Sequence, residues 1–145
     1  MGVPARISLV TLGVDDVARA TEFYVALGWR LSSSSVPGEV SFLDTAGSRL
    51  GLWSNAELAA EAYPGMTPSH VNVQGVALAI NVGSPAEVDD AIAAAEAAGA
   101  RIVQRPRAME WGGYSGYFAD PDGHAWEVAH NPGWPLGDDG LPQLP

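Results

Sequence analysis

The chain has 145 residues, with 17 acidic side chains against 7 basic ones and a formal net charge of −10. This length fits one domain, and 47% hydrophobic residues provide enough apolar material for a core, which excludes a disordered protein. There is no cysteine, so disulfide scaffolds, thiolate metal sites and cysteine nucleophiles are excluded. All basic residues are scattered arginines, so neither Schiff-base lysine chemistry nor nucleic-acid binding is expected.

No run of about 18 apolar residues could cross a bilayer. A basic segment followed by an apolar one is also missing at Met1. We therefore expect a soluble, cytoplasmic protein that has no membrane partner.

The first half of the chain predicts a strand, a helix and three more strands. Apolar and β-branched residues predict the first strand over residues 6–14, and Asp15 or Asp16 then caps a helix that ends at Gly28. Further strands are expected at residues 29–33, 39–44 and 49–53. Residues 55–69 are rich in Ala, Pro and Thr, and we interpret them as a loop.

The second half repeats this order. A strand over residues 71–82 precedes Ser84-Pro85-Ala86-Glu87, which is a capping box, and the helix behind it stops at Gly99. Strands are then expected at residues 101–103, 113–118 and 124–130. The turn Asp120-Pro121-Asp122-Gly123 joins the last two.

A shift of about 71 residues lays Gly99 on Gly28, so the chain is predicted to be one duplicated unit. The two βαβββ modules cover about residues 6–54 and 71–130 of a single domain over residues 1–145. Residues 131–145 are rich in Pro and Gly and are expected to form an extended tail.

Three features carry a family resemblance: Val14-Asp15-Asp16-Val17, Phe23-Tyr24 in the first helix, and the run from Gly116 to Pro132 that contains Asp-Pro-Asp-Gly and Trp-Glu-Val. Together with the βαβββ order, they resemble the vicinal oxygen chelate superfamily over about residues 6–132. That superfamily contains glyoxalase I, extradiol dioxygenases and bleomycin-resistance proteins. The resemblance implies an α+β fold in which each module's sheet curls into half of an open barrel, with helices outside and a cavity inside. It also implies a homodimer.

Alternation along the strands agrees with such a cavity. In the first strand the bulky face suits packing on a helix and consists of Val10, Leu12 and Val14, whereas the cavity face consists of Leu9, Thr11 and Gly13. In the fifth strand the small face, which leaves room for a ligand, consists of Ala77, Ala79 and Asn81.

The resemblance also implies four metal-ligand positions, on the first, fourth, fifth and last strands. They fall on Leu9, Gly51, Ala77 (or Val76 if the register slips by one) and Glu127. Only Glu127 has a donor side chain, and one carboxylate cannot hold a divalent ion. We therefore expect no metal and no other cofactor, with a divalent metal as the alternative.

The histidines offer another possible metal site. His124-x-x-Glu127-x-x-His130 would gather three ligands on one face of a helix, but on a strand Glu127 faces away from both histidines. The third histidine, His70, lies in the connector between the modules. We interpret the histidines as partly exposed polar residues at strand ends.

Glu127 is the candidate catalytic residue. A three-residue hairpin would place Tyr117 opposite Glu127 and Ser115 opposite Ala129, all facing the cavity. A carboxylate among apolar groups could act as a general base or acid, or bind a cationic or hydroxylated ligand. Alternatively, Glu127 is a former ligand that the hydroxyl of Tyr117 or Thr11 holds without catalysis.

Aromatic and charged residues complete the candidates. Aromatic residues near the cavity entrance are Trp53, Tyr63, Trp111, Tyr114 and Tyr117, and those expected in the core are Trp29, Phe42, Phe118 and Trp126.

The glycines of Met109–Gly113 suit either a cavity rim or a bulge. Helix caps are expected at Asp15, Asp16, Ser84 and Glu87. Arg105 and Arg107 either meet an anionic ligand or solvate a loop.

The predicted ligand-binding residues are Leu9, Thr11, Trp53, Ala77, Ala79, Asn81, Trp111, Tyr114, Ser115, Tyr117 and Glu127. We expect a metal-independent protein that binds a small apolar or aromatic molecule in the cavity. The alternatives are a glyoxalase-like lyase or isomerase that uses Glu127 as general base, and a lyase or dioxygenase that depends on a divalent metal.

Overall fold

The structure is a computed structural model that describes residues 5, 7–62 and 77–144. Its elements are β1 (Leu9–Val14), α1 (Val17–Ala26), β2 (Arg30–Leu31), β3 (Val40–Asp44), β4 (Arg49–Ser54), α2 (Asn55–Ala62), β5 (Leu78–Asn81), α3 (Pro85–Ala97), β6 (Arg101–Ala108), β7 (Tyr114–Ala119) and β8 (Ala125–His130). The predicted βαβββ order is therefore present twice. No described helix is long and apolar enough to span a membrane.

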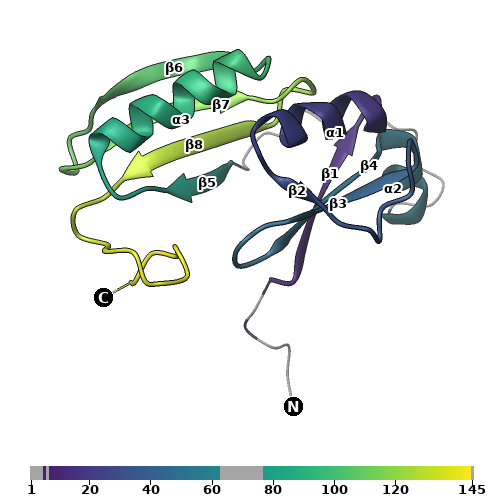
Figure 1. The fold of residues 1–145 in the computed structure, drawn as a ribbon, viewed down its shortest axis with the longest axis horizontal. Coiled ribbons are helices and arrows are strands. Elements are labelled where there is room, and N and C mark those ends of the chain that lie inside the picture. Colours follow the sequence, from purple (N-terminus) through teal and green to yellow (C-terminus); the bar gives the residue numbers. More distant parts are fainter. Residues whose placement is uncertain (1–4, 6, 63–76, 145) are drawn as a thin grey trace.

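Each module forms its own four-stranded mixed sheet. The strand orders are β1-β4-β3-β2 in the first sheet and β5-β8-β7-β6 in the second. In each sheet the first strand is parallel to the last, and the other pairs are antiparallel. Figure 1 shows α1 and α3 on the same side of the molecule, and both sheets are open rather than closed into a barrel. The α+β fold with two modules is thus confirmed.

One apolar core joins the two modules. It combines one face of α1 and one face of α3 with the inward faces of both sheets, and its buried members include Leu12, Val14, Phe23, Tyr24, Leu50, Leu52, Val88, Ile92, Phe118, Trp126 and Val128. The predicted helix-facing side of β1 is confirmed, because Leu12 and Val14 are buried while Leu9 and Thr11 are exposed. Trp29 packs against Tyr24, with ring centroids 5.3 Å apart, and belongs to this core as predicted.

Helix α2 occupies part of the chain that was predicted to be a loop. The Ser54 hydroxyl accepts a hydrogen bond from the Glu57 backbone nitrogen at 3.0 Å, so Ser54 and Glu57 stand at the spacing of a capping box. The loop prediction was therefore wrong for residues 55–62, where alanine, leucine and glutamate favour a helix. Residues 63–76, which include the predicted start of the fifth strand, lie outside the described residues.

Strand β6 continues to Ala108, beyond the predicted end at residue 103. Pro106, inside this strand, has no N–H group to donate to a strand ladder. However, β6 is an edge strand, and its register with β7 shifts on both sides of Gln104. An edge strand with bulges tolerates proline because the missing donor can face away from the sheet.

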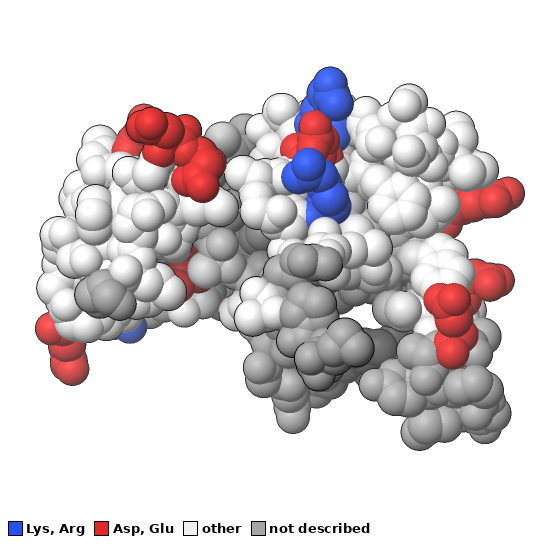
Figure 2. Space-filling view, turned by 90° about the horizontal axis from the view of Figure 1, so that it is seen from below, with Lys and Arg blue, Asp and Glu red and all other residues white. Residues whose placement is uncertain are grey.

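Charge is distributed unevenly on the surface. Figure 2 shows acidic side chains at several separate places, while most of the visible basic atoms gather in one group. In the first sheet, Arg30 and Arg49 lie on either side of Asp44, with nitrogen–oxygen distances of 3.1 and 3.3 Å. Two cations therefore share one carboxylate in a protein whose net charge is −10.

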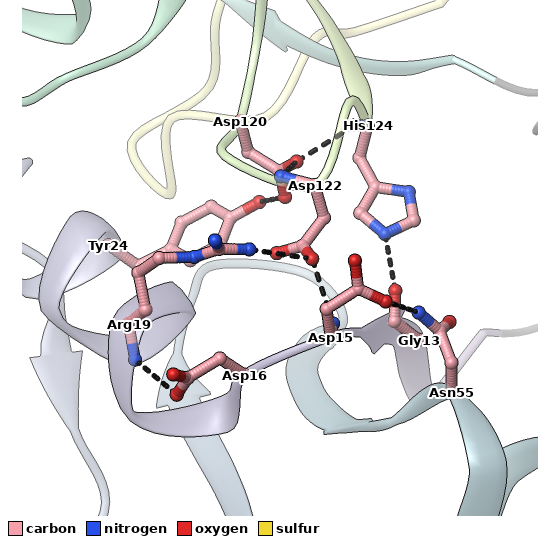
Figure 3. A network of polar contacts seen from close by, with 9 residues as sticks. All are labelled: Gly13, Asp15, Asp16, Arg19, Tyr24, Asn55, Asp120, Asp122 and His124. Carbon is pink, nitrogen blue, oxygen red and sulfur yellow. Dashed lines mark hydrogen bonds and ion pairs between the residues drawn. The ribbon is translucent and has the colours of Figure 1, made fainter. Parts of the chain in front are cut away.

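The carboxylate of Asp120 closes the turn between β7 and β8 and also links the modules (Figure 3). Its Oδ1 accepts from the backbone nitrogens of Asp122 at 2.9 Å and His124 at 2.8 Å. Its Oδ2 accepts from the Tyr24 hydroxyl of α1 at 2.6 Å, and Trp126 Nε1 donates to the same hydroxyl at 3.1 Å. Burial, followed by the charge of Asp120, raises the pKa of Tyr24, so this hydroxyl remains a donor.

Two more residues of the turn contact the first module. Asp122 Oδ1 accepts from the Asp15 backbone nitrogen at 2.8 Å and from Arg19 Nη2 at 3.3 Å. His124 Nε2 lies 2.7 Å from the carbonyl oxygen of Gly13, and it must be the donor because a carbonyl only accepts. His124 is only 7% exposed, so the expectation of a partly exposed histidine was wrong at this position. The turn reaches across to β1 and buries the ring.

Replacing Tyr24 by phenylalanine tests this link. Tyr24→Phe leaves a buried oxygen of Asp120 without a donor, so we expect a loss of about 1–3 kcal/mol in the free energy of unfolding. Tyr114→Phe is the matched control, because Tyr114 donates to Asp89 at 2.7 Å at an exposed site, and it should cost less than about 0.5 kcal/mol. Urea unfolding measures both, and equal losses would contradict the role of Asp120.

Candidate functional site

The face of the second sheet opposite α3, called here the second open face, carries Glu127. Cross-strand register gives one row of residues on this face: Gln104, Tyr117, Glu127 and Ala79. The adjacent row consists of Arg107, Ser115, Ala129 and Asn81. The prediction that Tyr117 lies opposite Glu127 and Ser115 opposite Ala129 is therefore confirmed.

Glu127 is half-buried and already has one partner. The Tyr117 hydroxyl donates to Glu127 Oε2 at 2.8 Å. This hydrogen bond, with smaller contributions from burial and from the carboxylate charge, raises the pKa of Tyr117. The other oxygen, Oε1, has no hydrogen-bond partner within the described part of the chain. Glu127 can therefore accept one more hydrogen bond without losing the first.

Small side chains surround Glu127 on the second open face. Ala79 is its neighbour on β5 and is exposed, and the positions before and after Glu127 on the same face of β8 are Ala125 and Ala129. Because an alanine projects a single carbon from the sheet, the carboxylate stands above its neighbours. Ala129 is only 5% exposed, but a flat molecule could lie on Ala79 and Ala125 and meet the carboxylate at its edge.

The row beside Glu127 holds further polar groups. Ser115 is 1% exposed, and its hydroxyl oxygen has no hydrogen-bond partner among the described residues. Arg107 is its register partner on β6. With the amide oxygen of Gln104 turned toward Arg107, this oxygen accepts from Arg107 Nε at 2.9 Å and Nη2 at 2.7 Å. Arg105 lies elsewhere, because it pairs with Glu96 of α3 at 2.9 Å.

The corresponding face of the first sheet, called the first open face, carries the other predicted cavity residues. A Cβ atom at Gly51 would lie 3.5 Å from the side chains of both Leu9 and Thr11 and 3.6 Å from the ring of Phe42. Trp53 follows Gly51 by two residues on β4, so alternation puts it on this face too. The prediction that Phe42 is a core residue was wrong, because its pairing with Gly51 turns it away from α1.

Two aromatic residues of the predicted ligand-binding set, Tyr114 and Trp111, lie outside the two rows of the second open face. Tyr114 donates to Asp89 of α3, so it lies on the helix side, and the prediction that it lines the cavity was wrong. Alternation separates it from Ser115, the next residue on β7. Trp111 lies in the turn between β6 and β7, is 50% exposed, and fills the space where a side chain at Gly113 would lie. The remaining candidates at positions 63, 70 and 76 (Tyr63, His70 and Val76) lie outside the described residues.

The helix caps expected at Asp16 and Ser84 are present, and His130 lies on the opposite face of β8 from Glu127. Asp16 caps α1 by accepting from the Arg19 nitrogen, and Ser84 caps α3 by accepting from the Glu87 nitrogen. Asp15 instead accepts from the Asn55 amide at 2.9 Å. His130 pairs with Tyr114 on the helix side, so Glu127 faces away from it as predicted.

The residues at the four family ligand positions do not fit a divalent metal. Leu9, Gly51 and Ala77 offer no lone pair, which leaves Glu127 as the single donor. Within the part of the chain that the structure describes, there is no group of three or more His, Asp or Glu side chains that could hold a metal ion. The Glu127 carboxylate by itself can accept hydrogen bonds and transfer protons.

Comparison with known proteins identifies the class. The family model of the Glyoxalase/Bleomycin resistance protein/Dioxygenase superfamily matches residues 6–128, and the chain belongs to this superfamily. Comparison with curated proteins gives no significant match.

Several solved structures share the fold. A glyoxalase-related enzyme from Fulvimarina pelagi is 32% identical, with a TM-score of 0.86 over 97% of this chain and 99% of that one. A glyoxalase/bleomycin resistance protein/dioxygenase from Nocardioides is 27% identical, with a TM-score of 0.72 over 100% and 93% of the two chains. A lactoylglutathione lyase from Agrobacterium tumefaciens is 26% identical, with a TM-score of 0.67 over 89% and 96%.

The contact between Tyr117 and Glu127 can be tested by titration. Because Glu127 raises the pKa of Tyr117, this hydroxyl should ionise above the ordinary tyrosine value of about 10. Glu127→Gln removes the charge, so the pKa of Tyr117 should fall toward that value, as measured by NMR of the tyrosine ring. Glu22→Gln on the exposed face of α1 is the control and should change nothing. An unchanged Tyr117 pKa in Glu127→Gln would disprove the contact.

Proposed function

We propose that this protein binds a small, largely apolar or aromatic molecule on the second open face, with Glu127 as its polar anchor and without a metal ion. The observation that carries the proposal is the position of Glu127, whose Oε1 is available beside Ala79 while Oε2 is held by Tyr117. A carboxylate accepts hydrogen bonds, so the ligand should present an N–H or O–H group, or a positive charge, at one edge. The rest of the ligand would cover Ala79 and Ala125.

A second candidate function is a lyase or isomerase on the same face. The names of two similar structures, a glyoxalase-related enzyme and a lactoylglutathione lyase, favour it. In this case Glu127 would take a proton from a carbon atom of the substrate and return it to a neighbouring atom, with Tyr117 holding the carboxylate in position. The four ligand positions provide no Lewis acid, so the carboxylate would have to act alone.

The homodimer and the cytoplasmic location are likewise proposals. Both come from the family resemblance and from the composition of the chain.

A ligand screen with variants tests the binding proposal. Small aromatic amides and alcohols are screened by thermal shift, because a bound ligand raises the melting temperature by mass action. For a compound that binds, Glu127→Gln should weaken binding about fivefold, which corresponds to a hydrogen bond of about 1 kcal/mol. Ala79→Phe should abolish binding by filling the space, whereas Ala94→Phe on the exposed face of α3 should not affect it.

The same variants distinguish the two candidate functions. A pure binder loses only affinity in Glu127→Gln. An enzyme loses all turnover of a substrate that it still binds. Binding that is unaffected by both Glu127→Gln and Ala79→Phe would refute the placement of the ligand on the second open face.

Metal analysis tests the part of the proposal that says the ligand binds without a metal ion. We expect that treatment with a chelator changes neither the melting temperature nor ligand binding, because Glu127 is the single donor at the four positions. The measurement is elemental analysis of the purified protein, combined with thermal shift before and after chelation. A stoichiometric divalent ion that is lost in Glu127→Gln, but retained in Glu22→Gln, would contradict a metal-independent site.

A further inference from the structure

A second candidate site lies on the first sheet. An open groove there has a volume of about 430 Å³, which falls in the range typical of small-molecule sites. Its lining residues are Ser8, Leu9, Arg30, Ser32, Ser34, Phe42, Leu43, Asp44 and Arg49. None of them belongs to the second sheet, which carries Glu127.

The charged residues of this groove have an excess of one positive charge. Asp44 accepts from Arg30 Nη2 at 3.1 Å and contacts Arg49 Nε at 3.3 Å, so one carboxylate serves two guanidinium groups. Arg49 also donates to the carbonyl of Thr45, which holds its guanidinium in place. Arg49 Nη2 and the Nη1 and Nε atoms of Arg30 have no acceptor among the described residues. These N–H groups are therefore available to an anion.

The remaining lining of the groove combines apolar side chains with serine hydroxyl groups. Leu9 is 44% exposed, and the ring of Phe42 is half-buried beside Gly51, which has no side chain. The Ser32 hydroxyl accepts from the Ser34 backbone nitrogen at 3.2 Å, so its own hydrogen is free to be donated. Apolar surface next to fixed positive charge suits a molecule with an apolar body and an acidic group.

We propose that the groove binds a small organic monoanion, whose carboxylate meets Arg30 and Arg49 and whose planar body covers Leu9 and Phe42. A guanidinium group presents paired N–H donors that match the two oxygens of a carboxylate. This site is separate from the proposed function, because its lining residues belong to the first module whereas Glu127 belongs to the second sheet.

The probe is 2-naphthoate, titrated into the full chain and followed by NMR of the backbone amides. We expect the shifted amides to be centred on Ser32 and Phe42. The neutral 2-naphthamide should bind at least about fivefold more weakly, since a single exposed ion pair contributes about 1 kcal/mol. Equal affinities for the two compounds, or shifts centred on β7 and β8, would overturn the proposal.

Variants make the test specific. Arg30→Gln and Arg49→Gln should each weaken 2-naphthoate binding about fivefold, and Asp44→Asn should strengthen it because a competing carboxylate charge is removed. Arg105→Gln is the matched control, since Arg105 is also exposed and paired with a carboxylate, Glu96, but lies outside the groove. Thermal melts verify that each variant is folded. Weaker binding in Asp44→Asn, or an equal loss in Arg105→Gln, would contradict a site built on the two arginines.

Discussion

The buried carboxylate of Asp120 is the interaction on which both the module contact and the candidate site depend. It is 3% exposed, it accepts two backbone hydrogen bonds inside the β7–β8 turn, and it accepts a third from Tyr24 of the first module. A buried carboxylate is costly unless hydrogen bonds compensate for lost water, and these three donors compensate for it. The same turn sets the register that brings Tyr117 opposite Glu127. One acidic side chain thus fixes the position of another.

Alternation along the strands determines what the two open faces can bind. Helix-facing positions such as Leu52, Phe118 and Val128 are large and buried, whereas the other face of each sheet carries exposed positions such as Thr11 and Ala79. On the second sheet that face carries Glu127 beside Tyr117 and Ala79, with Arg107 in the next row, whereas on the first sheet it carries Arg30 and Arg49 around Asp44. The two open faces therefore carry different sets of charged residues.

Much of this architecture could be predicted from the sequence. The repeated βαβββ order, the caps at Asp16 and Ser84, and the pairing of Tyr117 with Glu127 follow from local periodicity and turn chemistry. These features depend on residues close together in the chain. For the same reason, they are the part that sequence patterns describe best.

Features that depend on distant residues could not be predicted in this way. His124 is buried because its ring reaches Gly13, which is more than a hundred residues earlier in the chain. Phe42 is apolar like any core residue, and only its pairing with Gly51 reveals the face on which it lies. Helix α2 is different, since its capping box of Ser54 and Glu57 was a usable local signal.

The central claim is that Glu127 alone provides the polar centre of the second open face. A crystal structure of the full chain, grown with a screened ligand and an added divalent cation, tests this claim most directly. The ligand should lie over Ala79 with a donor group at Glu127, and no cation should be bound there. A cation held by Glu127 together with imidazole groups, or a Glu127 side chain turned out into water, would contradict the account.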